Sequence, residues 1–418
     1  MSTRMKAESE IVARQYEAWV YPKPETDLEA TVRAGHFDYS DPSLFRRKLW
    51  PRNVEPTGLE ILVAGCGSNQ AALYAFRNPD CHVVGIDISE PSLSHQKFLK
   101  QKHNLRNLDL FLMDIGLVGE LNADFDLIVS TGVLHHLADP DAGLQILKRV
   151  MRPNGVMSLM LYGYYRRFGV YMMQEAFRLL GIGQDRRGLD LVKEIIANLP
   201  NWHHANSYIR EAQDLQYDSG IIDTFLHPQD RAYTVSQVLE FAEVGGLSFQ
   251  SWLDNAYYSV DAVFPPGYPL VALAKTLPRE KRWQLVELVA QSIACHRFLL
   301  CHQGRPAGDY SLDFSSSDTE AAWLSYKPGI RHPVGCVQQA NLSTGSPARL
   351  RRDIHEFEVS AIESLWLEAV DGKKSIRDIL ESQPSPAAHR TNRFEVAKAF
   401  FERMADFDHL QFELPRRR

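Results

Sequence analysis

The sequence predicts an α/β fold built on a doubly wound parallel sheet, and three observations predict it. An apolar run over 60–63 is followed at once by two glycines one residue apart, Gly65 and Gly67. A second apolar run, over 82–86, ends at an acidic residue, Asp87. Further apolar runs then alternate with segments of helical periodicity. Such alternation is typical of βαβ units, in which helices join parallel strands.

The paired glycines and the acidic residue together predict an adenosine-containing cofactor. Glycine has no Cβ, so its backbone can approach a ligand closely. A carboxylate at the end of the second strand can accept hydrogen bonds from both ribose hydroxyls. A dinucleotide site would place a third glycine where Gln70 stands, so a nicotinamide-dependent oxidoreductase is the more distant alternative. A P-loop is excluded because no Lys-Ser or Lys-Thr follows the last glycine.

Three more strands follow in order. Residues 107–115 predict a third strand that ends near Asp114, and residues 126–131 a fourth strand that enters a polar loop. A helical segment over 142–151 leads to the turn Arg152-Pro153-Asn154-Gly155 and then to a fifth strand over 156–161.

Over residues 55–165 the chain resembles the class I S-adenosylmethionine (SAM)-dependent methyltransferases. Within that family it is similar to the small-molecule branch, which carries Val-Leu-His-His-Leu after strand four, here residues 133–137, and Arg-Pro-Asn-Gly before strand five. The resemblance implies a Rossmann-like sheet, SAM as the cofactor, and methyl transfer as the reaction.

The resemblance also implies which residues bind the cofactor. The glycines would pass under the methionine part of SAM, Asp87 would hold the ribose, and Asp114 would accept from the adenine amino group. Asn69 and Ala64 depart from the glycine and the acidic residue that the family usually has there. The expected cofactor-binding residues are Gly65, Cys66, Gly67, Asp87, Ile88, Asp114, Ile115, Thr131 and Val133. The Cys66 side chain is expected to be a small apolar filler rather than a nucleophile.

Candidate catalytic residues follow the fourth and fifth strands. His135 and His136 are candidates for a general base, with packing or capping as the alternative. Tyr162, Tyr164 and Tyr165 begin where the fifth strand ends, the edge at which this fold binds its substrate. These tyrosines are expected to orient the acceptor or relay a proton.

Residues 1–54 predict a helical N-terminal arm. Tyr16, Trp19 and Tyr21 give it an aromatic segment that resembles the lid of small-molecule methyltransferases. A lid of this kind excludes water from the reaction, and these three residues are expected to contact the acceptor. The alternative is that the segment only fastens the arm to the domain.

Residues 55–264 are expected to form the SAM-binding domain, with a helical insertion over 170–230 that caps the acceptor. At its end, Gln229, Arg231 and Tyr233 are expected to reach the acceptor pocket, or else to hold a structural hydrogen-bond network. Arg166 and Arg167 would either pair with an anionic acceptor or lie in solvent.

The remainder of the chain leaves the family pattern. Residues 265–349 are expected to be helical over 270–300 and then a connecting segment. Residues 350–418 predict a small α+β domain that weakly resembles a winged helix, with a homodimer through this module as one expectation. Helices are expected over 360–369, 376–380 and 393–405, and a strand over 409–414.

Composition bounds the location and the partners. A chain of 418 residues predicts two or more domains, and a net charge of −6 argues against a nucleic-acid partner. The sequence shows no signal peptide and no apolar run of membrane length, and the five cysteines are few, so a cytoplasmic protein without a membrane partner is expected. No metal is expected, because Cys295-His296 and Cys301-His302 match no standard zinc spacing.

The expected function is methyl transfer from SAM to an oxygen, nitrogen or sulfur atom of a small-molecule acceptor. A small thiol is one candidate, because part of a thiol is already ionised at neutral pH. Two alternatives stay open: a protein or peptide methyltransferase that docks its target on the C-terminal module, and a SAM-binding regulator without catalysis.

Overall fold

The computed structural model describes residues 12, 14–52, 58–265, 267–316, 320–330, 348–352, 355–383 and 393–416. The chain divides into two compact units that are interleaved along the sequence. The first comprises Met1–Ala34, Thr57–Phe249 and Gln291–Gln303. The second comprises Gly35–Pro56, Gln250–Ala290 and Gly304–Arg418.

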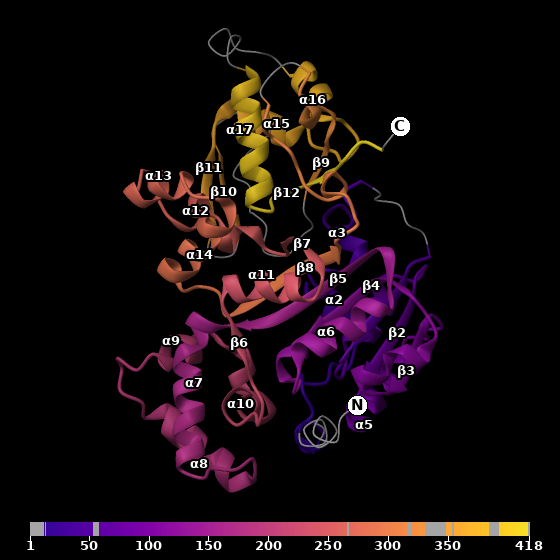
Figure 1. Cartoon of the computed structure of the whole chain (residues 1–418), viewed down its shortest axis with the longest axis vertical. Helices are drawn as coiled ribbons and strands as arrows, with labels where there is room; N and C mark the ends of the chain where they lie inside the picture. Colours follow the sequence, from indigo (N-terminus) through magenta and orange to yellow (C-terminus); the bar gives the residue numbers. More distant parts are fainter. Residues whose placement is uncertain are drawn as a thin grey trace. The chain divides into compact units, whose positions relative to one another are not determined.

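An eight-stranded sheet with the order β3-β2-β1-β4-β5-β8-β7 organises the first unit (Figure 1), and β6 pairs with β5 off this path. The strands are β1 (Glu60–Ala64), β2 (His82–Asp87), β3 (Leu108–Leu112), β4 (Phe125–Thr131), β5 (Met151–Gly163), β6 (Ala232–Tyr233), β7 (Leu247–Trp252) and β8 (Cys295–His302). Strands β1 to β5 pair in parallel, and β8 pairs antiparallel with β5. The predicted α/β, Rossmann-like fold class is confirmed.

Parallel pairing brings the segments after β1, β2, β4 and β5 to one edge of the sheet, because all four strands end there. The connecting elements are α4 (Gln70–Arg77), α5 (Glu90–Lys102), η1 (Ile115–Leu121), η2 (Leu134–His136), α6 (Pro140–Arg149) and α11 (Val235–Val244). Side-chain caps fix where several of them begin: Ser89 accepts from Ser92 at α5, and Asp139 accepts from Ala142 at α6. The sequence order of strand, glycine turn and helix therefore sets the position of the site.

The expected helix over 270–300 is wrong at its end. The chain forms α13 (Pro269–Lys275) and α14 (Arg279–Ala290), and then β8 enters the sheet beside β5. In β8, His296 is fully buried and Cys295 half-buried. A short apolar run fits a buried strand as well as a helix, and here pairing with β5 decides.

The helical insertion predicted between the fifth strand and the end of the sheet is confirmed in its helical character. It contains α7 (Tyr164–Leu179), α8 (Arg186–Ala197), α9 (Ala205–Glu211), η3 (Gln213–Gln216) and α10 (Asp218–Phe225). The insertion has its own apolar core, in which α7, α8 and α10 meet, and Trp19 of the arm packs against it. The arm also contains a helical stretch over 14–18 and α2 (Leu28–Arg33).

The second unit contains α3 (Pro42–Leu49), η4 (Asn255–Tyr258), α12 (Val260–Val263), α13, α14, η5 (Ala307–Asp309), η6 (Ala322–Ser325), β9 (Lys327–Ile330), β10 (Ala348–Arg352), β11 (His355–Val359), α15 (Ala361–Glu368), α16 (Ile376–Ser382), α17 (Arg393–Asp406) and β12 (Leu410–Glu413). The three helices and the strand predicted beyond residue 350 are confirmed. Capping boxes at Ser360 and Ser375 start α15 and α16. The winged-helix resemblance and the homodimer stay predictions.

Parts of two sequence-based expectations lie outside the described residues: the start of the arm before residue 12, and residues 331–347 of the connecting segment with Cys336. Among the helices that the structure describes, none has the length and apolar character needed to cross a bilayer.

Candidate active site

The loop after β1 has a backbone conformation that glycine adopts readily. Gly65 and Gly67 have φ angles of +76° and +54°, a region that residues with a Cβ rarely adopt. The N–H groups of Gly65 and Cys66 both donate to the carbonyl of Ile86, at 2.9 and 3.0 Å. The loop is therefore tied to the end of β2.

Asp87 holds the same loop from the other side. Its Oδ2 accepts from the N–H of Gly67 at 2.7 Å, and its Oδ1 accepts from the N–H of Ser89 at 2.9 Å. Burial raises the pKa of Asp87, while the two backbone N–H groups act in the opposite direction. A buried carboxylate with two donors thus lies at the edge of the sheet where the cofactor is predicted.

The other predicted cofactor residues lie at this edge, but not all in the expected way. A Cβ on Gly65 would stand 2.4 Å from Cγ2 of Val133, so these two residues are in direct contact. Thr131 accepts a hydrogen bond from Gln70 at 3.1 Å. Asp114 caps η1 by accepting from the N–H of Gly116 at 2.7 Å.

Two side chains from the predicted cofactor set point into the protein. Cys66 is buried, and its Sγ lies 3.2 Å from the position of a Cβ on Gly85, so it packs in the core as a filler. Ile115 is buried as well, and Ile88 is half-buried. Cys66 can therefore meet a ligand only through its backbone.

The N-terminal arm is fastened by its three predicted aromatic residues. Tyr16 donates to Oδ1 of Asp223 at 3.0 Å, Trp19 donates to the carbonyl of Gln184 at 3.1 Å, and Tyr21 donates to Asp214 at 3.0 Å. All three partners belong to the insertion.

The arm also covers the glycine loop. The carbonyl of Pro22 accepts from the Ser68 hydroxyl at 2.9 Å, and a Cβ on Gly67 would stand 2.9 Å from Cδ of Pro22. The arm thus connects the predicted cofactor loop with the helical insertion.

A carboxylate of α10, Asp223, is the centre of a buried hydrogen-bond cluster. Its Oδ1 accepts from Tyr16 and, at 3.4 Å, from Gln15, and its Oδ2 accepts from Tyr162 at 3.2 Å. Burial raises the pKa of Asp223, and the same cause, with the nearby carboxylate, raises the pKa values of Tyr16 and Tyr162. This cluster joins the arm, β5 and the insertion.

Arg167 is the buried cation beside this cluster. Its guanidinium lies 3.7 Å from the ring centroid of Tyr162 and donates to the Tyr208 hydroxyl at 2.5 Å. One of its nitrogens stands 3.5 Å from Oδ2 of Asp230, which also accepts from Gln174 at 3.0 Å. Arg167 is thus buried and paired, whereas its neighbour Arg166 pairs with Glu211.

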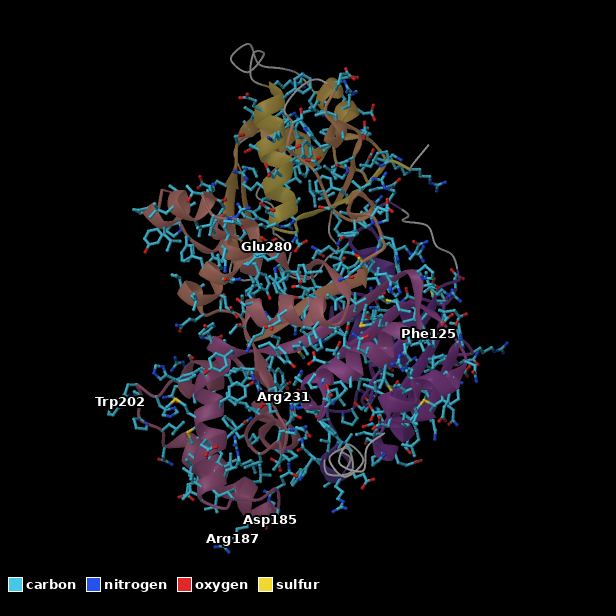
Figure 2. All side chains as sticks on the ribbon, viewed as in Figure 1. Phe125, Asp185, Arg187, Trp202, Arg231 and Glu280 are labelled. Carbon is cyan, nitrogen blue, oxygen red and sulfur yellow. The ribbon has the colours of Figure 1, made fainter. Side chains whose placement is uncertain are left out.

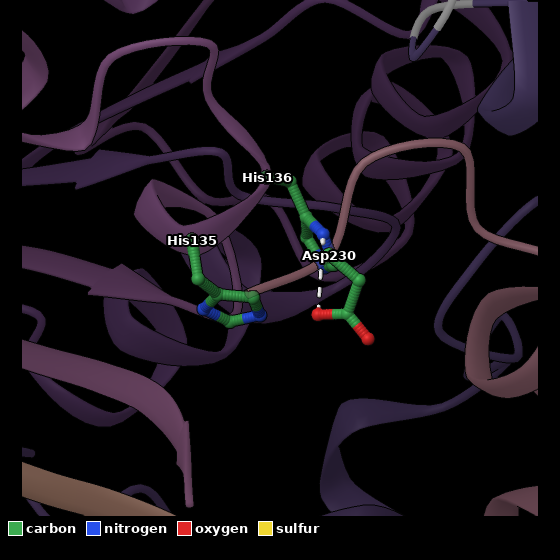
Figure 3. A group of neighbouring side chains, drawn as sticks. All are labelled: His135, His136 and Asp230. Atoms are coloured by element: carbon green, nitrogen blue, oxygen red, sulfur yellow. Dashed lines mark ion pairs between the residues drawn. The ribbon is translucent and has the colours of Figure 1, made fainter. Parts of the chain in front are cut away.

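The imidazole rings of His135, His136 and His227 pack together in one cluster. The His136 ring lies 4.2 Å from the His135 ring and 3.8 Å from the His227 ring, between centroids. Figure 3 shows His135 and His136 side by side with the Asp230 carboxylate facing them. Burial, together with the neighbouring His136, lowers the pKa values of His135 and His227 well below the usual value.

A pocket of about 480 Å³ reaches Asp230 from one side. It is lined by Tyr164, one of the predicted catalytic residues, and by Arg231 and Tyr233, two of the predicted acceptor-binding residues. Arg231, which Figure 2 labels, is exposed and donates to the Ala138 carbonyl at 2.9 Å. Burial raises the pKa of Tyr233 to about 12.

Two other predicted residues, Tyr165 and Gln229, make contacts near the pocket. Tyr165 packs edge-on against Tyr164, at 5.3 Å between ring centroids. Gln229 contributes backbone groups, since its carbonyl bonds to Nδ1 of His136 at 2.8 Å and its N–H donates to Nδ1 of His227 at 3.1 Å.

Sequence reasoning assigned no role to Asp223, His227 or Asp230, and left the role of Arg167 open. One signal was available for Asp223: it stands in the apolar run Ile221-Ile222-Asp223-Thr224-Phe225, where a carboxylate needs buried partners. No local pattern reveals its partner Tyr16, which lies 207 residues away along the chain.

The comparisons with known proteins agree with this geometry. The family model described as a methyltransferase domain matches residues 56–198. Residues 56–198 form a SAM-dependent methyltransferase domain. SAM is accordingly its cofactor, and the positive-φ glycine pair beside the buried Asp87 carboxylate suits an adenosyl ligand.

Relatives of this methyltransferase differ in what they are named for. An uncharacterised protein of Synechococcus is 29% identical over 72% of this chain and 74% of its own length. The tRNA U34 carboxymethyltransferase of Pseudoalteromonas translucida is 35% identical, and the tRNA 5-carboxymethoxyuridine methyltransferase of Escherichia coli 32% identical, each over 26% of this chain. The chain matches only 35% and 41% of the lengths of these two enzymes.

Among solved structures, PKMT2 from Rickettsia typhi shares the fold, with a TM-score of 0.62. The likeness covers 94% of this chain and 77% of PKMT2, at 17% sequence identity. The common architecture therefore extends through most of the chain, whereas the acceptor has to be inferred from the site itself.

Proposed function

We propose that this methyltransferase acts on an oxygen, nitrogen or sulfur atom of a small-molecule acceptor bound at the carboxyl edge of the sheet. The observation that carries the proposal is the buried cluster in which Tyr16, Tyr162 and Asp223 meet. A buried carboxylate with hydroxyl partners from the arm, the sheet and the insertion can hold one polar group of an acceptor in a fixed direction.

The proposed cofactor contacts follow from the loop. Asp87 would accept hydrogen bonds from the ribose hydroxyls, either in place of those from the backbone N–H groups or in addition to them. Asp114 would accept from the adenine. The loop Gly65–Gly67, with Thr131 and Val133, would face the methionine end, while Ile88 and Ile115 would pack beside the adenine. SAM supplies the methyl group as an electrophile on a sulfonium leaving group.

Orientation and exclusion of water are the main tasks left to the chain. The acceptor atom forms the new bond to carbon as the carbon–sulfur bond breaks, so the two must be held in line. In the structure, Tyr16, Trp19 and Tyr21 hold the arm against the insertion. We propose that this arrangement is the closed form of a lid, and that Tyr162 and Asp223 direct the acceptor.

The pocket that Asp230 helps to line has the size of a small acceptor. Ligand pockets commonly measure about 300–1,000 Å³, and this one measures about 480 Å³. Tyr164, Arg231 and Tyr233 would contact the outer part of the acceptor, and Tyr165 would support Tyr164. The polar lining favours an acceptor that carries hydroxyl, amine or thiol groups over a wholly apolar one.

An acceptor panel tests the proposal. Purified full-length protein is incubated with SAM and, in separate reactions, with thiols, phenols, amines, carboxylic acids, peptides and transfer RNA, and release of S-adenosylhomocysteine is measured. We expect turnover with at least one small-molecule class. Turnover only with peptides or only with RNA would reject the small-molecule acceptor, and tight SAM binding without turnover in any reaction would favour the regulator.

A pair of variants on α10 then tests the cluster. Asp223→Asn is expected to lower kcat/KM about tenfold to a hundredfold, because it removes a buried charge that orients the acceptor. Asp218→Asn is the matched control on the same helix, since Asp218 pairs with Lys193 and Arg186 in a more exposed position. Equal effects of the two variants would contradict the assigned role of Asp223.

A further inference from the structure

The buried cluster of His135, His136 and Asp230 contains polar atoms that the hydrogen bonds there do not use. Among the residues that the structure describes, none makes a hydrogen bond to either ring nitrogen of His135, to Nε2 of His136 or to Oδ1 of Asp230. Their side chains are at most 4% exposed. Buried polar atoms of native proteins nearly always have a hydrogen-bond partner, so four neighbouring atoms without one indicate a missing ligand.

The orphaned groups belong to a set with metal-binding geometry. One nitrogen of His135, one nitrogen of His136 and one carboxylate oxygen of Asp230 lie within 4.8 Å of one another. Ligands of one zinc ion stand about 2.0–2.2 Å from the metal, hence roughly 3–4 Å from each other. Atoms at the upper limit of this spacing would have to move about an ångström closer to share one ion.

A second triad, formed by His136, Asp223 and His227, has the same spacing. Its other hydrogen bonds make it the poorer choice. Nδ1 of His227 accepts from the N–H of Gln229, so its proton is on Nε2, the atom that a metal would need. Asp223 already accepts from Tyr16 and Tyr162.

The first triad has the opposite pattern. Nδ1 of His136 bonds to the Gln229 carbonyl at 2.8 Å, which places its proton there and leaves the Nε2 lone pair free. A backbone carbonyl on the remote nitrogen is the usual support of a metal-binding histidine. On Asp230, Oδ1 accepts no hydrogen bond among the described residues and lies 4.0 Å from Nδ1 of His136, while Gln174 and Arg167 hold Oδ2.

The charges favour a cation as well. Asp223 and Asp230 contribute two negative charges to the buried cluster, and Arg167 contributes one positive charge. Two carboxyl groups thus stand against one guanidinium in this cluster, which suits a bound cation.

We infer that His135, His136 and Asp230 bind a divalent transition-metal ion of the zinc class. Two imidazoles and one carboxylate are the ligands of several catalytic zinc and iron(II) sites, which keep open positions for substrate. The two histidines are then metal ligands rather than general bases, contrary to the expectation that the chain needs no metal. That the ion would contact the acceptor atom rests on the proposed function. That these three residues bind an ion does not depend on it.

Metal binding is tested directly on untagged full-length protein. The protein is stripped with a chelator, dialysed against Zn²⁺, and its metal content is measured by mass spectrometry together with its thermal midpoint. We expect one Zn²⁺ per chain and a higher midpoint. Absence of bound Zn²⁺ in the well-folded wild-type protein would overturn the inference, whatever the acceptor panel shows.

Variants assign the ligands. His135→Gln, His136→Gln and Asp230→Asn are each expected to weaken Zn²⁺ binding at least tenfold, with circular dichroism as the check on folding. His227→Gln is the matched control in the same cluster and is expected to retain binding within about threefold. If His227→Gln abolishes binding while Asp230→Asn does not, the other triad holds the ion and this assignment is wrong.

Discussion

The N–H of Gly67 donates to Oδ2 of Asp87 across 2.7 Å, which joins the glycine loop after β1 to the end of β2. The second oxygen of the same carboxylate accepts from Ser89 at the start of α5. The two features that most strongly predicted an adenosine cofactor are therefore one structural unit. A change at either residue alters both the loop and the ribose contact proposed for it.

Asp87→Ala is expected to weaken SAM binding at least about tenfold, which corresponds to about 1.4 kcal/mol. The substitution removes the proposed ribose acceptor and releases the glycine loop. Isothermal titration calorimetry with SAM measures the effect. Asp80→Ala, at an exposed residue just before β2, is the control. An unchanged dissociation constant for Asp87→Ala would remove the proposed role of this carboxylate.

Gly67→Ala is expected to destabilise the protein and to displace the arm. The positive φ angle costs alanine about 1–2 kcal/mol, and its Cβ would also stand 2.9 Å from Pro22. Gly58→Ala separates the two effects, because Gly58 has a φ of +65° and no described atom within 4 Å of the added Cβ.

Urea unfolding of both glycine variants, together with limited proteolysis of the arm, measures the difference. Gly67→Ala should lose more stability than Gly58→Ala, and its arm should be cleaved faster. If both variants lose the same stability and their arms are cleaved equally, Pro22 does not restrict the loop.

The local part of this site could be predicted from sequence, and the part made by distant residues could not. The glycine pair, Asp87 and the histidine pair lie in short motifs whose positions follow from alternating strands and helices. By contrast, Asp223 meets Tyr16 and Tyr162 only because α10 and the arm fold onto β5. Strand β8 was mistaken for helix because pairing with β5, rather than periodicity, determines its structure.

The Tyr16–Asp223 bond is expected to stabilise the closed arm, and a double-mutant cycle measures its strength. Tyr16→Phe leaves Oδ1 of buried Asp223 with only the longer bond to Gln15, so a loss of about 1–3 kcal/mol in unfolding free energy is expected. When Tyr16→Phe is combined with Asp223→Asn, we expect a coupling energy of about 0.5–3 kcal/mol, because the two residues are in direct contact.

Tyr21→Phe is the control for that cycle, because the partner of Tyr21, Asp214, is exposed. Its loss should stay below that of Tyr16→Phe. Additive effects of Tyr16→Phe and Asp223→Asn, with no coupling energy, would show that the hydrogen bond contributes nothing to arm closure.

His82 is expected to make the stability of the sheet depend on pH. Its Nδ1 lies 2.7 Å from Glu60 and its Nε2 3.0 Å from Asp109, so it connects β1, β2 and β3. Burial disfavours the charged imidazole, but the bonds to these two carboxylates outweigh it and raise the pKa of His82 above the usual value of 6.5.

A raised folded-state pKa means that the native state binds the proton more tightly than the unfolded chain. The contribution is therefore complete below about pH 6.5 and is lost as pH rises through the folded-state value. Because the imidazole is partly exposed, the effect should be below about 1 kcal/mol. Urea unfolding of wild type and His82→Gln between pH 5.5 and about 8.5 measures it: the stability difference between the two should shrink toward high pH, and a difference that grows with pH would contradict the assigned ion pairs.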